Sequence, residues 1–248
     1  MSDIVIGHTG PVITVTLNRP EKMNAITRSM YQSMADALSS AAVDPEISVV
    51  IIQANGDHFT AGNDISDFLN NPPLEEGSEV WQFIKAAHEF PKVLIAATQG
   101  NAVGIGSTMI MHCDFAYASP TTRFRMPFVN LGLVPEFGAS YLFPKSMGHR
   151  RAAELLLMGR PFTAHEAFQW GMVNEVVDEP KARAHEVAKL VAEQPPNALI
   201  QAKQLMKSSD HERLNVIMGA EGELFQKALT SEEAQNAFMN FMMRKGSQ

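Results

Sequence analysis

Cysteine is nearly absent from this chain of 248 residues, which carries Cys113 alone. A single thiol excludes a disulfide within the chain and any metal site built from several cysteines. Cys113 lies in the apolar stretch 108–115, where we expect a small buried residue rather than a nucleophile. A reducing compartment is compatible with this composition.

Basic charge and long apolar runs are lacking as well. Lys and Arg number 20 against 27 Asp and Glu, and the formal net charge is −7, which disfavours nucleic acid as a partner. Apolar runs such as 48–54 and 93–98 are too short to span a bilayer. No signal peptide, peroxisomal tripeptide or lipidation motif is recognisable. We therefore expect no membrane partner and a cytoplasmic location.

Several familiar catalytic motifs are missing. The glycine-rich stretch 100–109 follows an apolar strand, yet Met109 stands where a dinucleotide-binding fingerprint needs its third glycine. Neither a P-loop nor a nucleophile elbow occurs. The eight histidines show no ligand spacing with Cys, Asp or Glu, so we expect no metal site.

What the chain does contain is an alternation of short apolar strands and amphipathic helices. Apolar residues make up 45% of it and charged residues 19%, which indicates an ordered globular protein. Continuous apolar strands between helices favour an α/β fold whose parallel sheet is covered on both faces. The predicted strands are 12–17, 48–54, 93–99, 115–119 and 172–178. The predicted helices are 28–42, 79–90, 107–113, 163–171, 198–208, 211–228 and 231–242.

Two turns with small residues follow predicted strands and have a chemical interpretation. In 58–65 the backbone can approach a ligand, and Asp64 is placed to cap the turn that begins at Ile65. In 100–107 glycines lead into a helix, whose outward N–H groups and dipole would stabilise a developing negative charge. Each turn alone also has an ordinary explanation, as an Asx-capped loop and as tight strand–helix packing.

Five collinear stretches resemble the enoyl-CoA hydratase/isomerase (crotonase) family over almost the whole chain: 17–26, 58–65, 98–119, 123–148 and 156–176. The resemblance is closest to peroxisomal-type Δ3,Δ2-enoyl-CoA isomerases of fatty acid metabolism. It implies an acyl-CoA substrate, with coenzyme A as part of the substrate and no separate cofactor. It also implies a crotonase-like spiral of β-β-α units over residues 1–194, which holds the CoA-thioester site. Residues 195–248 would form a helical trimerisation region, giving a homotrimer or a dimer of trimers.

The matching motifs also imply site residues. Backbone N–H groups of Ala61 and Ile105 would hold the thioester oxygen as an enolate forms, although the family often has glycine where Ile105 stands. The other substrate and CoA contacts would be Lys22, Met23, Ala25, Gly62, Asn63, Asp64, Ile65, Phe128 and Leu133. The stretch 67–80 would form a variable wall of the acyl pocket.

According to the resemblance, hydration and isomerisation differ in the number of catalytic carboxylates that they need. Hydratases of the family use two glutamates, but the matching positions hold Thr108 and Phe128, so an efficient hydratase is disfavoured. Isomerisation needs one base, which takes a proton from C2 and returns it to C4. Glu136, in "LVPEFGASY", matches the isomerase glutamate and is the predicted base.

Some questions stay open at this level. From composition alone, Glu136 would be a solvent-exposed loop acid. Under the family interpretation, Val134, Pro135 and Phe137 would give it an apolar surround, and such a surround raises a carboxyl pKa. Related isomerases often carry Asn where this chain has Gln99. Another crotonase-type reaction (hydratase, hydrolase or lyase) and a non-catalytic acyl-CoA-binding role remain alternatives.

Overall fold

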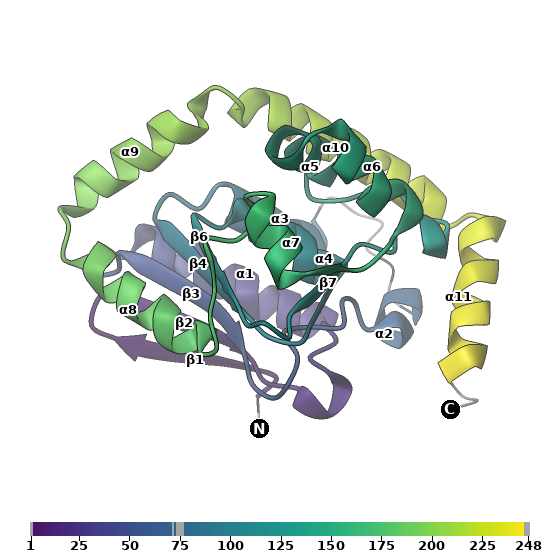
Figure 1. Ribbon diagram of the computed structural model, residues 1–248, viewed down its shortest axis with the longest axis horizontal. Coiled ribbons are helices and arrows are strands. Elements are labelled where there is room, and N and C mark those ends of the chain that lie inside the picture. Colours follow the sequence, from purple (N-terminus) through teal and green to yellow (C-terminus); the bar gives the residue numbers. More distant parts are fainter. Residues whose placement is uncertain (1, 71, 73–76, 246–248) are drawn as a thin grey trace.

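A six-stranded sheet forms the centre of the computed structural model, which describes residues 2–70, 72 and 77–245 (Figure 1). The strand order is β1-β2-β3-β4-β6-β9, with β1 antiparallel to β2 and the remaining neighbours parallel. These strands are β1 (Ile4–Thr9), β2 (Val12–Leu17), β3 (Val49–Ala54), β4 (Val93–Thr98), β6 (Phe115–Ala118) and β9 (Glu175–Val176). A second sheet joins β5 (Asn101–Val103), β7 (Arg123–Arg125) and β8 (Phe162–Thr163).

Helices cover both faces of the larger sheet, as its continuous apolar strands require. α8 (Pro180–Ala192) packs across one face, while α1 (Arg28–Val43) and α3 (Glu79–His88) lie over the other (Figure 1). Alternate residues of β3 show the division, because Ile51 joins the cluster under α8 and Val50 joins the larger core. The remaining helices are α2 (Ile65–Asn70), α4 (Ile105–Thr108), α5 (Ala139–Met147), α6 (His149–Met158), α7 (Ala164–Gln169), α9 (Pro196–Ser208), α10 (His211–Leu229) and α11 (Glu232–Lys245).

Most predicted elements are confirmed, and several short elements were missed. The four strands predicted between residues 12 and 119 are correct to within one residue. β1, α2, α5, α6 and the second sheet were not predicted; Pro144 inside α5 argues against a helix when read from sequence. The helix predicted at 107–113 begins earlier, at Ile105, and the strand predicted at 172–178 shrinks to β9. The part of the predicted wall 67–80 at residues 71 and 73–76 lies outside the described residues.

The C-terminal helices α9, α10 and α11 run as an arc around the outside of the core (Figure 1). α9 lies entirely within the described residues, and Lys203 is its one buried residue. Its Nζ donates to Asp114 Oδ2 and to Lys92 O, each at 2.6 Å. Asp114 Oδ2 also accepts the N–H of Leu94 in β4 at 2.8 Å. This ion pair therefore anchors α9 to the central sheet. None of the helices in the described ranges is long and apolar enough to cross a membrane.

We expect Lys203→Met to lower the free energy of unfolding by about 2 kcal/mol, because it leaves the partly buried Asp114 carboxylate without its charged partner. Urea denaturation followed by circular dichroism measures the change. Lys227→Met on α10 is the matched control, since Lys227 is exposed and should change stability by less than about 0.5 kcal/mol. Equal stability of the two variants would contradict the anchoring role of Lys203.

Candidate active site

Glu136 lies in the turn between the 3₁₀ helix Val129–Leu131 and α5. It is only 7% exposed, and its Oε1 has no hydrogen-bond partner among the described residues. The backbone that follows is strained, since Phe137 has a φ of 58°. A buried carboxyl oxygen without a hydrogen bond costs free energy, so this arrangement points to a function rather than to stability. The sequence-only expectation of an exposed loop acid is wrong.

The environment of Glu136 makes it a stronger base than an ordinary glutamate. Burial, together with a smaller contribution from the neighbouring Glu221 carboxylate, raises the pKa of Glu136 to about 8. A carboxyl with a pKa near the working pH is suited to taking up a proton and giving it back. The same shift also appears in carboxyls that serve as general acids, so the pKa alone does not select the reaction.

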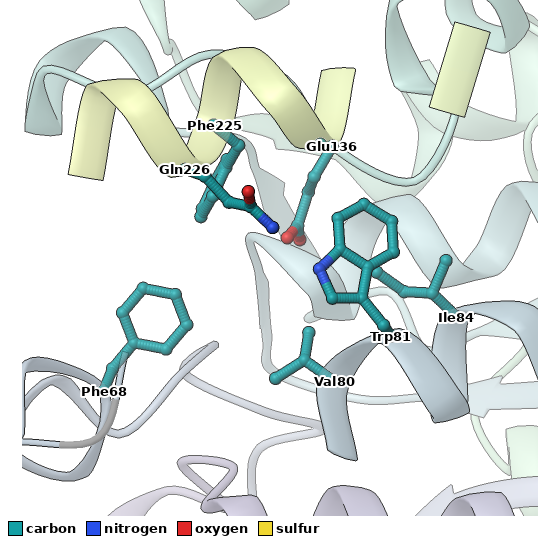
Figure 2. Close-up of a pocket in the computed structure, with 8 residues that line it drawn as sticks. Phe68, Val80, Trp81, Ile84, Glu136, Phe225 and Gln226 are labelled. Atoms are coloured by element: carbon teal, nitrogen blue, oxygen red, sulfur yellow. The ribbon is translucent and has the colours of Figure 1, made fainter. Parts of the chain in front are cut away.

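A small pocket with a cavity volume of about 20 Å³ opens beside Glu136. Residues of α2 and α3 line one part of it, and residues of α10 line another (Figure 2). The lining residues are Phe68, Val80, Trp81, Ile84, Glu136, Gly222, Phe225 and Gln226. In Figure 2 the Glu136 carboxyl, the Gln226 amide and the Trp81 indole point toward one another. The pocket is thus an apolar chamber with a few polar groups gathered around one carboxyl.

Residues next to Glu136 in the sequence do not form the pocket wall. Val134, Pro135 and Phe137 do not line this pocket as far as the structure describes it. The Phe137 ring instead stacks on His112, with ring centroids 3.7 Å apart. The apolar wall comes from α2 and α3, which are close in sequence, and from the distant helix α10. Phe68 and Val80 fall within the stretch 67–80 that was predicted as a wall, whereas no local signal in the sequence distinguishes the residues of α10 from an ordinary core face.

The assignment of an oxyanion donor to Ala61 also needs correction. The Ala61 N–H donates to Met23 O at 2.9 Å, so it is engaged within the protein. The N–H of Gly62 is engaged too, with Thr60 Oγ1 at 3.0 Å. The N–H of Asn63 has no acceptor among the described residues, although its neighbour on each side is bonded. Asn63 therefore replaces Ala61 as the candidate donor of this turn.

Ile105 is placed as a second candidate donor. It is the first residue of α4, and its N–H has no acceptor within the part of the chain that the structure describes. The residue is 1% exposed and its side chain belongs to the main core, so the side chain is held by core packing. The two turns touch, because a Cβ added to Gly106 would lie 2.3 Å from Thr60 Cγ2. Val103 N also donates to Thr60 O at 3.0 Å.

Tyr31 connects the first turn with the base and was missed in the sequence. Its hydroxyl donates to Asn63 Oδ1 at 2.5 Å. Its ring lies 5.6 Å from the Phe83 ring, which lies 6.2 Å from the ring of Phe137, the residue after Glu136. Burial raises the pKa of Tyr31 well above its usual value, and the Glu136 charge also raises it. Tyr31 sits on the buried face of α1, where an aromatic residue is indistinguishable from core by sequence. The base and one candidate donor thus belong to one site.

A sequence profile of the enoyl-CoA hydratase/isomerase family matches residues 7–247. The chain belongs to this family. Enoyl-CoA delta isomerase 2 of Rattus norvegicus is 37% identical over 250 residues, which are 98% of this chain and 64% of the rat protein. The chain thus spans less than two thirds of that relative. The 2,3-dehydroadipyl-CoA hydratase of Escherichia coli K12 is 30% identical, with 99% of this chain and 97% of the hydratase covered.

The solved structure of Pseudomonas aeruginosa OdaA superposes with a TM-score of 0.95 and 41% identity, covering 98% of this chain and 99% of that one. The predicted crotonase-like α/β fold is therefore confirmed. Proteins named as isomerases and as hydratases both resemble the chain. Membership of the enoyl-CoA hydratase/isomerase family leaves the reaction to be argued from the site.

The segments to which the family resemblance assigns CoA contacts lie side by side. Ile26 N donates to Gly62 O at 2.8 Å and Asp64 N donates to Ile26 O at 2.9 Å. Lys22 and Met23 are exposed at this edge. These placements fit a binding surface, and the contacts of Lys22, Met23, Ala25, Gly62, Asn63 and Ile65 with CoA stay predictions.

Asp64 has a structural role in this enoyl-CoA hydratase/isomerase family member. Its Oδ2 accepts from Arg19 Nη1 at 2.7 Å, and Arg19 Nη1 also donates to Ala25 O at 3.0 Å. Its Oδ1 accepts the N–H of Ser66 at 3.1 Å, which caps α2 as the sequence predicted. Ile65 begins α2 and packs against the main core.

The remaining predicted positions do not gather at the Glu136 pocket. Phe128 and Leu133 are buried in the main core and are absent from the described lining. Thr108 is fully buried, and its hydroxyl lies 3.5 Å from Ile105 O. The Gln99 amide donates to Ala54 O and Gly56 O, so it holds the loop before the first turn. Among the described residues, no three His, Cys, Asp or Glu side chains are grouped to hold a metal ion.

Proposed function

We propose that the protein is a Δ3,Δ2-enoyl-CoA isomerase, which moves the double bond of a 3-enoyl-CoA into conjugation with the thioester. The observation that carries the proposal is the buried Glu136 carboxyl, with a raised pKa and one unbonded oxygen beside an apolar pocket. Thr108 and Phe128 supply no second carboxylate at the positions where hydratases of the family have one. One base suffices for isomerisation but not for efficient hydration.

The proposed reaction moves one proton and leaves no net change in atoms. Glu136 takes a proton from C2, and the electrons of that bond spread onto the thioester oxygen to form a dienolate. The N–H groups of Asn63 and Ile105 would stabilise that oxygen. Glu136 then returns the proton to C4, which leaves the double bond between C2 and C3. The apolar walls disfavour water, the competing reactant.

The reaction is tested with a panel of 3-enoyl-CoA thioesters, following formation of the conjugated 2-enoyl-CoA by absorbance and identifying products by mass. Conversion to an isomer of unchanged mass supports the proposal. A product heavier by one water would show hydration, a cleaved thioester would show hydrolysis, and smaller carbon fragments would show a lyase. Tight binding of the thioesters without turnover would favour an acyl-CoA-binding role.

The outer helices fit the assembly that the resemblance implies. Large apolar side chains are exposed on α9 and α10: Leu205, Met206, Val216 and Leu224. Burial between subunits would remove them from water. We propose that they contribute to a homotrimer or a dimer of trimers, and we expect light scattering to give three or six times the chain mass. A monomer at micromolar concentration would contradict this. The division at residue 195 and the cytoplasmic location stay predictions.

Gly222 sets the position of Trp81 in the pocket wall. A Cβ added to Gly222 would lie 2.2 Å from Trp81 Cη2, so the indole would have to move. We expect Gly222→Ala to lower kcat/KM about tenfold, the effect of roughly one methyl group in an apolar site. Gly219→Ala on the same helix is the control, because its added Cβ would have nothing within 4 Å. Steady-state kinetics compare the variants, and equal values would exclude this role of Gly222.

A further inference from the structure

The turn that carries Glu136 is tied to the C-terminal helix α10 by a buried carboxylate. Glu221 Oε2 accepts the N–H of Gly138 at 2.6 Å, and Glu221 Oε1 accepts the N–H of Ser140 at 2.8 Å. Glu221 is 6% exposed, so these bonds are shielded from water. Charge-assisted bonds of this kind are among the strong hydrogen bonds of proteins. They fix the backbone immediately after the proposed base.

A second contact holds the same turn from the other side. His112, in the 3₁₀ helix Met109–His112, lies 2.7 Å by its Nε2 from Phe137 O. A carbonyl oxygen only accepts, so Nε2 carries the proton and donates. Burial lowers the pKa of His112 to about 3, which keeps the ring neutral. The strained backbone of Phe137 is thus fixed by two hydrogen bonds: neutral His112 donates to its carbonyl oxygen, and the Glu221 carboxylate accepts the N–H of the next residue, Gly138.

Only one of the groups around Glu136 carries charge at neutral pH, as far as the described residues go. Tyr31 faces it from α1 and Glu221 from α10, while His112 contacts the adjacent Phe137. Tyr31 stays neutral because its pKa lies well above 10. Burial raises the pKa of Glu221, but its bonds to the N–H groups favour the ionised form. Glu136 Oε1 has no such bond, so of the two carboxyls Glu136 holds the proton and Glu221 holds the charge.

We propose that Glu221 is the positioning residue of the Glu136 base, fixing the turn from α10 and placing a constant negative charge beside it. The kinetic part of this inference rests on the proposed isomerase function; the effect on the ionisation of Glu136 does not. The charge disfavours the Glu136 carboxylate and so strengthens it as a proton acceptor. The bonds keep its side chain aimed into the pocket. The C-terminal region thereby sets both the basicity and the direction of a group in the core.

The ionisation is tested directly by infrared titration of the protonated carboxyl band, assigned to Glu136 by its loss in Glu136→Gln. We expect Glu221→Gln to lower the titration midpoint of that band by on the order of one pH unit. Glu223→Gln is the matched control, an exposed glutamate on the same helix, and should leave the midpoint unchanged. A midpoint unchanged in Glu221→Gln would overturn the electrostatic part of the proposal. This readout needs no turnover.

Kinetics test the positioning. Glutamine offers one acceptor oxygen to two N–H donors, so we expect the plateau kcat of Glu221→Gln to fall about tenfold with little change in KM. The acid limb of kcat should move to lower pH together with the infrared midpoint. Glu221→Asp keeps the charge but shortens the reach, so its midpoint should stay high while its kcat falls.

Wild-type kcat in both Glu221 variants would overturn the positioning role. If Glu221→Gln does not fold, Glu221→Asp decides, with reduced kcat at an unchanged midpoint as the supporting result and wild-type kcat as the contrary one. If the wild-type protein isomerises none of the thioesters, the proposed function fails, while the infrared midpoints of the Glu221 variants still decide the effect on Glu136.

Discussion

Glu136→Gln is expected to lower kcat for isomerisation of a 3-enoyl-CoA by about 10³-fold, because an amide cannot take up the C2 proton. The side chains have nearly the same size, so the pocket should keep its shape and KM should change little. Absorbance of the conjugated product, followed with the wild type and the variant side by side, measures the effect. We expect a large decrease in kcat because Glu136 is the one carboxylate among the described residues that line the pocket, so no other carboxylate there can replace it as the base.

Two further results sharpen this experiment. Glu223→Gln, which removes an exposed carboxylate from α10, should keep wild-type kcat. In the wild type, kcat/KM should rise with pH through a midpoint near 8, since the base must be deprotonated and burial raises the pKa of Glu136 to about 8. If Glu136→Gln retained more than about a tenth of the wild-type kcat, the proton would have to move through another group.

The same substitution is expected to stabilise the protein at alkaline pH, by roughly 5 kcal/mol at pH 8.5. In the unfolded chain a glutamate ionises near pH 4.3, whereas the folded protein keeps Glu136 protonated up to about pH 8. The contribution of Glu136 to stability is therefore complete below about pH 4 and is lost as the pH rises toward 8, at about 1.4 kcal/mol for each pH unit. Glutamine does not ionise and escapes this loss.

Urea denaturation at pH 5 and pH 8.5 tests the expectation. The difference between Glu136→Gln and the wild type should be small at the lower pH and large at the higher one. Glu223→Gln should differ from the wild type by less than about 0.5 kcal/mol at both. A difference that does not grow with pH would mean that Glu136 is not held protonated by the fold. A gain in stability that accompanies a loss of activity is the expected behaviour of a destabilised active-site group.

The central sheet could be predicted from the sequence because each of its inner strands is a local run of apolar residues. Runs such as 49–54 and 93–98 are apolar throughout, which is what strands covered on two faces require. β1 lacks this signal, since after Ile4 its residues are exposed. α5 follows Gly138 and contains Pro144, and glycine and proline both argue against a helix when read from the sequence. Such elements depend on the neighbours that the chain meets after folding.

The candidate site likewise has features that the sequence predicts and features that only the fold shows. Glu136 was found through the family resemblance, and its burial, which gives it a raised pKa, became visible only in the fold. Phe68 lies within the stretch 67–80 that the sequence analysis named as a wall, whereas the contribution of Phe225 was not predictable, because α10 is far away in sequence. The choice of Asn63 over Ala61 depends on the Met23 carbonyl, which reaches Ala61 from a distant segment. Motif matching locates such a turn but does not say which of its donors is already used.

The position of α10 has a consequence for how substrate preference is inherited. Gly222, Phe225 and Gln226 lie in the same 19-residue helix as Glu221, and all four face the pocket or the turn of the base. Swapping this one helix for that of a relative would exchange part of the acyl wall and the partner of the base in a single step. A chimaera with the exchanged helix would then change both its preference for acyl chain length and the pH dependence of its activity, although the helix lies outside the main sheet.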